Sequence, residues 1–147
     1  MENEHVKKYL NGAIISIVLL VVLLIIDAQI YNKTMPLSAP ITFIVLHVTI
    51  YRYLIPEKKF AAYFFFVLVM GAAVFFSLPE FTHQQAKEKV VASYDMELIE
   101  LGNLPLVDSW NPFASRWAYA FEVVDPSSQT RIRLLFIPHS GKVFEID

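Results

Sequence analysis

Three long apolar runs without a charged residue dominate the first half of the chain. They contain 18, 18 and 20 residues, and a helix needs about 18 to 20 apolar residues to cross a membrane. The charged residues that bound the runs are Lys8 and Asp27, Lys33 and Arg52, and Lys59 and Glu80. The pattern therefore predicts three transmembrane helices within residues 1–79, with spans at about 10–31, 36–54 and 60–79.

After Pro79 the pattern becomes that of a water-exposed domain. Thr82 and Gln85 have the spacing of a helix N-terminal capping box, and apolar residues then recur at positions 86, 90, 91 and 94. This spacing predicts a helix over residues 82–94. Because the helix begins soon after the third span, we expect it to lie close to the membrane.

Strand patterns follow this predicted helix. Residues 96–101 fit a strand that ends at Gly102 and Asn103, and residues 104–112 contain two prolines that limit strand pairing. Residues 117–124 and 131–137 alternate as half-buried strands do, and 142–146 fit a short final strand. We therefore expect residues 80–147 to form a small α+β domain with one helix on an antiparallel sheet.

Basic residues near the predicted spans indicate the orientation in the membrane. With the N-terminus in the cytoplasm, five of these residues lie inside and only Lys33 lies outside. The five are Lys7, Lys8, Arg52, Lys58 and Lys59. Since Lys and Arg favour the cytoplasmic side, a multi-pass protein of a cell membrane with an extracytoplasmic C-terminal domain is expected.

Composition excludes several functions for the C-terminal domain. Residues 80–147 carry 10 acidic and 6 basic residues, so we expect no nucleic-acid partner, which would need a basic surface. The chain contains no cysteine, which excludes disulfides, thiol catalysis and cysteine-ligated metals. The expected partners are the lipid bilayer and a protein of the membrane or cell envelope.

The C-terminal segment resembles a PepSY-type domain over about residues 82–147. The resemblance is carried by the helix with Gln85-Ala86 and Val90, the aromatic strand 117–124, the strand 131–137 and the closing turn Ser140-Gly141-Lys142-Val143. The acidic residue that usually opens this turn is replaced here by Pro138 and His139. Membership would imply an extracytoplasmic, membrane-tethered α+β module, without catalytic residues, that regulates a peptidase.

Two ionisable residues lie within the predicted spans. His47 is near the middle of the second span, where a proton relay, a haem ligand and a metal ligand are the functional alternatives. A haem between helices would need a second axial ligand, and no other His lies in a span. A neutral imidazole bonded to Thr42, Thr49 or Ser77 is the structural alternative. Asp27 lies nearer the outer end of its span, where we expect it to reach the interface.

The residue patterns indicate no enzyme, cofactor site or metal site. The chain contains no metalloprotease, serine-hydrolase or phosphate-loop motif, and the carboxylates of the domain are scattered. Trp110 and Phe113, in a proline-containing loop, are candidates for a partner-binding anchor, since such aromatics carry much of the energy of interfaces. Folding back onto the small core is the alternative for both side chains.

Together these features predict a non-catalytic bacterial membrane protein that presents an extracytoplasmic binding or regulatory domain. A peptidase or another envelope protein is the expected target of this domain. The alternative is a small accessory subunit of a membrane transporter or redox complex, in which His47 and the helices carry the function.

Overall fold

A computed structural model describes residues 2–94, 96–106, 111–125 and 130–146. The chain divides into two compact units. The helical unit contains Met1–Ile26 and Leu37–Ser77, and the sheet unit contains Asp27–Pro36 and Leu78–Asp147. The segment Asp27–Pro36, which joins the first two helices, thus belongs with the C-terminal domain. We call this segment the strap.

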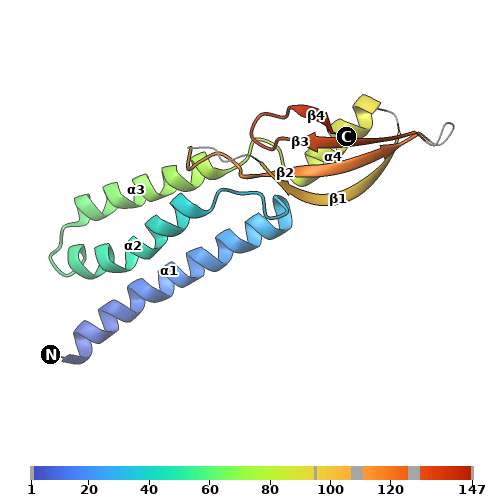
Figure 1. The fold of residues 1–147 in the computed structure, drawn as a ribbon. Helices are drawn as coiled ribbons and strands as arrows, with labels where there is room; N and C mark the ends of the chain where they lie inside the picture. The colour runs from blue at the N-terminus through green and yellow to red at the C-terminus, as the bar shows by residue number, and fades with distance from the viewer. Residues whose placement is uncertain (1, 95, 107–110, 126–129, 147) are drawn as a thin grey trace. The chain divides into compact units, whose positions relative to one another are not determined.

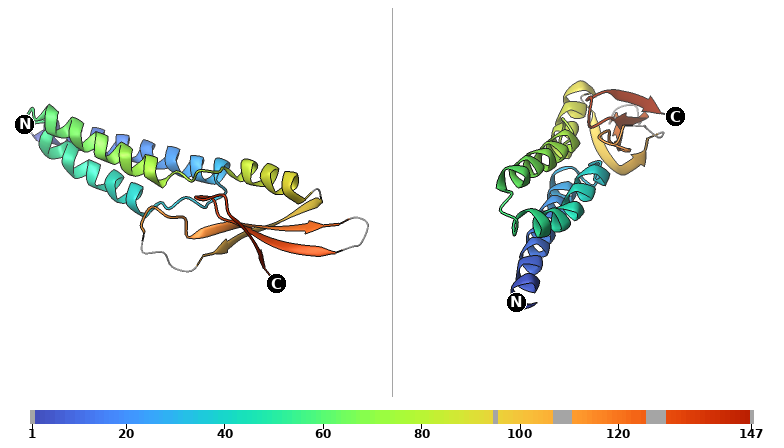
Figure 2. Two further views of the ribbon diagram at one scale, coloured as in Figure 1. Left: turned by 90° about the horizontal axis from the view of Figure 1, so that it is seen from above. Right: turned by 90° about the vertical axis from the view of Figure 1, so that its left-hand side faces the viewer.

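Three helices build the helical unit: α1 (Glu2–Ile30), α2 (Ser38–Leu54) and α3 (Phe60–Ser77). Helices α2 and α3 run antiparallel, side by side, joined by a short turn (Figures 1 and 2). Helix α2 begins shortly after Pro36 and ends at Leu54, although Ile55, the residue before Pro56, still has helical dihedrals (φ −68°, ψ −46°). Gly12 allows α1 to approach α2 closely, because a Cβ there would lie 2.8 Å from Tyr51 Cδ1.

Two helices of the described chain are long and apolar enough to cross a membrane. These segments are Leu10–Ile30 and Phe60–Ser77. Helix α2 has 17 residues, one fewer than the shortest of the three predicted apolar runs. The prediction of three spanning helices is therefore supported for two, and α2 falls just short of the length of about 18 residues that spanning helices need.

The sheet unit is an α+β domain, as predicted. Helix α4 (His83–Tyr94) precedes four antiparallel strands in the order β1-β2-β3-β4. The strands are β1 (Glu97–Pro105), β2 (Trp117–Val124), β3 (Arg131–Phe136) and β4 (Val143–Ile146). The capping box is present, because the Thr82 N–H donates to Gln85 Oε1 over 2.9 Å and the Gln85 N–H to Thr82 Oγ1 over 3.2 Å. Each side chain thereby satisfies a backbone donor of the first helical turn.

The core of the sheet unit lies between α4 and one face of the sheet. Its fully buried residues are Ala86, Val90, Tyr119, Phe121, Val123, Leu134 and Phe136. The β2 members alternate along the strand, and Phe121 pairs with Leu134 while Tyr119 pairs with Phe136. Alternating side chains of a strand share one face of the sheet, so the aromatic side chains of β2 lie under α4.

Strand β1 is longer than the sequence pattern predicts. Gly102 was expected to end it, but the strand continues to Pro105 after a register shift between Glu100 and Gly102. Gly102 has φ +102°, which L-residues rarely adopt and glycine adopts freely. The glycine therefore forms an irregularity within the strand and does not terminate it.

Candidate functional site

The first polar site lies inside the helical unit and is centred on His47 of α2. Its Nδ1 lies 2.8 Å from Ser16 Oγ of α1, and its Nε2 lies 2.8 Å from the hydroxyl of Tyr63 in α3. His47 and Ser16 are both buried. One imidazole therefore links the three helices, and both of its ring nitrogens have a hydrogen-bond partner.

The partners of His47 differ from those expected. Thr42 and Ser77 bond backbone oxygens one turn earlier in their own helices, Ser38 O and Ala73 O, each over 2.8 Å. Ser and Thr often form this bond within helices, and here it uses their hydroxyl protons.

Among the described residues there is no group of three His, Cys, Asp or Glu that could hold a metal ion.

The second polar site is the strap itself. The carboxylate of Asp27 accepts the Met35 N–H over 2.9 Å, and the carbonyl of Asp27 accepts the N–H of Lys33 over 3.0 Å. Asn32 and Lys33 have positive φ values of 48° and 64°, which let the chain reverse direction. Asp27 is thus buried as the closing group of a turn. Its expected place near the membrane interface stays a prediction.

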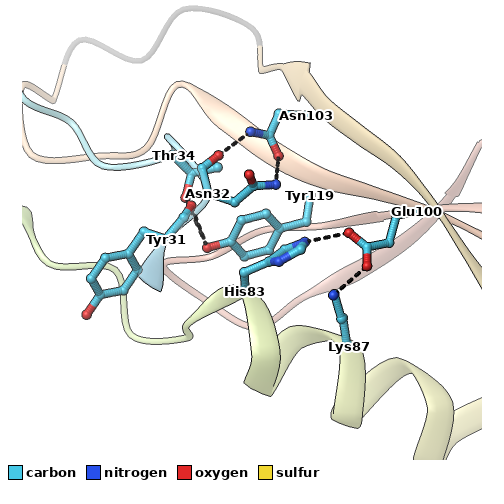
Figure 3. A network of polar contacts seen from close by, with 8 residues as sticks. All are labelled: Tyr31, Asn32, Thr34, His83, Lys87, Glu100, Asn103 and Tyr119. Carbon is cyan, nitrogen blue, oxygen red and sulfur yellow. Dashed lines mark hydrogen bonds and ion pairs between the residues drawn. The ribbon is translucent and has the colours of Figure 1, made fainter. Parts of the chain in front are cut away.

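The strap is hydrogen-bonded to the sheet through Tyr119 of β2 (Figure 3). The Tyr119 hydroxyl donates to the carbonyl oxygen of Tyr31 over 3.1 Å and lies 3.1 Å from the hydroxyl of Thr34. Thr34 in turn donates to the same carbonyl over 2.7 Å. Thr34 and Tyr119 are fully buried. Burial raises the pKa of Tyr119 to about 12, so this hydroxyl keeps its proton as a donor.

Two further bonds fix the strap to the same end of the sheet. The Asn103 side-chain amide donates to the carbonyl oxygen of Asn32, and the Asn32 amide approaches Asn103 Oδ1 at 3.5 Å (Figure 3). Ser115 donates to the carbonyl oxygen of Thr34 over 2.8 Å. These anchors come from the end of β1 and from the residues before β2, which lie far from the strap in sequence.

A charged cluster on α4 lies next to Tyr119. The His83 ring meets the Tyr119 ring edge-on, with centroids 4.9 Å apart. His83 Nε2 is 3.5 Å from a carboxylate oxygen of Glu100, and Lys87 forms an ion pair with the same carboxylate (Figure 3). Burial lowers the pKa of His83, Lys87 lowers it further, and Glu100 opposes both effects.

One Ser–His contact belongs to the anchoring of the strap. Ser115 Oγ lies 3.0 Å from His139 Nδ1, but Ser115 is buried and its proton is donated to the carbonyl of Thr34. A nucleophilic serine needs its proton directed at the base. The geometry therefore makes Ser115 a structural donor.

The predicted partner-binding loop is described in part. Trp110 lies outside the described residues, and Phe113 is half-buried. The Phe113 N–H donates to Asn111 Oδ1 over 3.0 Å, which closes a local turn.

The sequence pattern did not predict that the strap belongs to the sheet unit, although Tyr31 and Met35 are large apolar residues in a short loop.

Comparison with known proteins gives no match to a family model, to a curated protein or to a solved structure. The resemblance to PepSY-type domains accordingly rests on the residues of the sequence, and a function has to be argued from the chain itself.

Proposed function

We propose that this chain is a non-catalytic bacterial membrane protein that presents an extracytoplasmic, PepSY-like domain to a protein partner. The sheet unit binds the partner and regulates it, and a peptidase or another envelope protein is the target class. The single observation that carries this proposal is the anchoring of the strap to the domain by Tyr119, Asn103 and Ser115.

The strap makes regulation physically plausible, because it is continuous with two helices. Its first residues are the last turn of α1, and α2 begins two residues after its end. A domain tethered only by a flexible linker could turn without moving the helices. Here a partner that shifts the sheet unit also displaces the ends of α1 and α2.

The connectivity supports three membrane crossings with the sheet unit outside. Both α1 and α3 lead directly into the sheet unit at their C-terminal ends. If both helices cross in the same direction, α2 has to carry the chain back. Its 17 residues extend about 25 Å at roughly 1.5 Å per residue, and a modest shortfall from the bilayer thickness is met by local thinning. The distribution of basic residues favours a cytoplasmic N-terminus.

The order of elements supports the PepSY-like assignment. One helix precedes an antiparallel sheet, and the turn Ser140-Gly141-Lys142 joins the last two strands. Gly141 has φ +61°, and a Cβ there would lie 2.5 Å from the Phe81 ring. Position 141 therefore requires glycine. This requirement explains the glycine of the closing turn on which the resemblance to PepSY-type domains partly rests.

The test is purification of the full chain from its native membranes after mild solubilisation. The control is a chain in which a domain of similar size replaces residues 80–147, with the helices unchanged. We expect a partner in near-equal amount with the full chain and its loss from the control. If both proteins retain the same partner, the helices bind it and the proposal fails.

A second candidate function is supported by the His47 site. A buried Ser–His–Tyr chain is unusual among apolar helices, and polar groups there often serve transport or proton transfer. The chain would then be an accessory subunit of a transporter or redox complex. Loss of the activity of the complex in His47→Ala, with unchanged assembly, would favour this role. Thr42→Ala is the matched control, since Thr42 bonds only within α2.

A further inference from the structure

The sheet unit has a second face that α4 does not cover. Helix α4 packs on the aromatic side of β2, and the described residues of the unit place no other helix on the opposite face (Figure 2). We call the opposite side the open face. The strand register gives its apolar members, which include Ile99, Leu104, Ala118, Ala120, Leu135 and Phe144. The same register places the charged residues Glu97, Glu122, Arg131 and Arg133 on this face.

Apolar residues of different size form the part of the open face nearest Ala118 and Ala120. Ile99, Leu104 and Phe144 are 41%, 40% and 51% exposed. Ala118 and Ala120 are small and buried in the central strand between them. Large apolar side chains thus lie on both sides of the two small alanines, as on a surface that binds another secondary-structure element. Exposed apolar surfaces of this kind mark interaction sites.

Two arginines lie at one end of the open face. Arg133 and Arg131 flank the buried carboxylate of Glu122, at N···O distances of 3.7 Å and 3.6 Å. Both arginine side chains are more than half exposed. At these distances Glu122 orients the guanidinium groups without taking up their N–H donors. A hollow of about 430 Å³ adjoins them.

We propose that the open face is the partner-binding surface, and that it receives an amphipathic helix of a protein partner. The apolar side of that helix lies on Ile99, Leu104 and Phe144. An acidic side chain of the helix reaches Arg131 and Arg133, whose planar groups bind carboxylates through paired hydrogen bonds. This inference rests on the proposed function and names the surface that performs it.

The strap, which continues directly from α1, is anchored at Tyr119, whereas the arginines lie beside Glu122 and Val124. Tyr119 and Val124 are five positions apart in β2, which is roughly 17 Å at about 3.4 Å per residue. The charged end of the open face is thus the end remote from the strap.

The test is photocrosslinking of the full chain in native membranes. A benzophenone amino acid is placed at Phe144 on the open face and, as a matched control, at Val91, an exposed residue of α4. We expect one protein adduct from position 144 and none from position 91. The adduct should be lost in Arg133→Glu and recovered when the acidic residue of the identified partner is changed to Lys.

Affinity for the identified partner gives a second measurement. Phe144→Ala should weaken binding at least about thirty-fold, the effect of truncating an interface hot spot. The urea unfolding midpoint of the sheet unit, followed by Trp fluorescence, should stay unchanged. If Phe144→Ala binds normally, the open face is not the binding surface.

Other adducts would overturn the inference in distinguishable ways. Crosslinks to lipid would assign the open face to the membrane surface. Crosslinks to a second copy would indicate self-association. A partner that crosslinks only at Phe113 or at α4 would contradict the surface and leave the proposed function intact.

Discussion

At the scale of single residues, the chain concentrates buried polar groups at two places. In the helical unit His47 joins three helices, and in the sheet unit Tyr119 joins the strap to the sheet. A buried polar group without a partner costs more than a hydrogen bond gains. Both sites therefore favour the observed packing, because separating the elements would leave these buried groups without their partners.

Replacing Tyr119 by Phe tests the anchoring of the strap. Tyr119→Phe removes the donor to the Tyr31 carbonyl and the neighbour of the Thr34 hydroxyl. We expect the free energy of unfolding of the sheet unit to fall by about 1–3 kcal/mol. Urea unfolding of the full chain in micelles measures it, because both tryptophans lie in residues 80–147. Tyr94→Phe is the control: Tyr94 is half-buried, but its hydroxyl makes only an exposed contact of 3.4 Å with Glu145, so stability should change by about 0.5 kcal/mol or less. Equal midpoints for both variants would contradict the role of Tyr119.

The environment of His83 predicts that acid weakens the sheet unit. Burial and Lys87 lower the pKa of His83 below its ordinary 6.5, while Glu100 opposes the shift. The unfolded chain therefore binds a proton more readily than the folded one, so stability rises with pH. The contribution of neutral His83 to stability is fully present above pH 6.5, and it decreases as the pH falls from there towards the lowered pKa. The slope of the urea midpoint against pH over this range should be smaller in His83→Gln. An unchanged slope would assign the dependence to other groups.

At the scale of secondary-structure elements, the sheet unit follows its sequence pattern closely. The capping box at Thr82 and Gln85 begins the helix, and alternation along 117–124 gives the strand whose aromatics form the core. These features depend on neighbouring residues, which a pattern can capture. The length of β1 was missed because a glycine often ends a strand, whereas Gly102 forms an irregularity within one.

The strap and the helix-joining role of His47 could not be predicted from the pattern, because both depend on distant partners. Thr34 looks like a solvent-exposed loop residue, yet its neighbours Ser115 and Tyr119 lie more than 80 positions away. Local periodicity carries no information about such pairs. The composition of the loop was a usable signal, since Tyr31 and Met35 would be unfavourable in a fully solvated connection.

Two phenylalanines on opposite faces of the sheet test the assignment of its core. Phe121 is 1% exposed under α4, whereas Phe144 is 51% exposed on the open face. Phe121→Ala should lower the free energy of unfolding by about 3–5 kcal/mol, because it removes core packing. Phe144→Ala should change it by about 0.5 kcal/mol or less if the side chain contributes little to the core. The same Trp-monitored urea titration compares the two variants. Similar losses would mean that both faces contribute to the core.

At the scale of the whole molecule, connectivity relates membrane topology to function. The chain enters the sheet unit after α1, leaves it before α2 and enters it again after α3. The three helices are therefore joined to one domain at Asp27, Leu37 and Leu78. If the domain regulates a partner as proposed, these junctions connect it covalently to α1 and α2 through the strap and to α3 through its C-terminal end.

Thiol labelling tests the proposed topology, and the absence of cysteine gives a clean background. Lys142→Cys places one thiol on an exposed position of the sheet unit, and Glu57→Cys places one in the turn between α2 and α3 without removing a basic residue. In spheroplasts an impermeant maleimide should label Cys at 142, because three crossings carry the sheet unit outside. Cys at 57 should react only after permeabilisation. Labelling of both positions from outside would mean that α3, which lies between them, does not cross the membrane. The reverse pattern would place the sheet unit in the cytoplasm and exclude an extracytoplasmic partner.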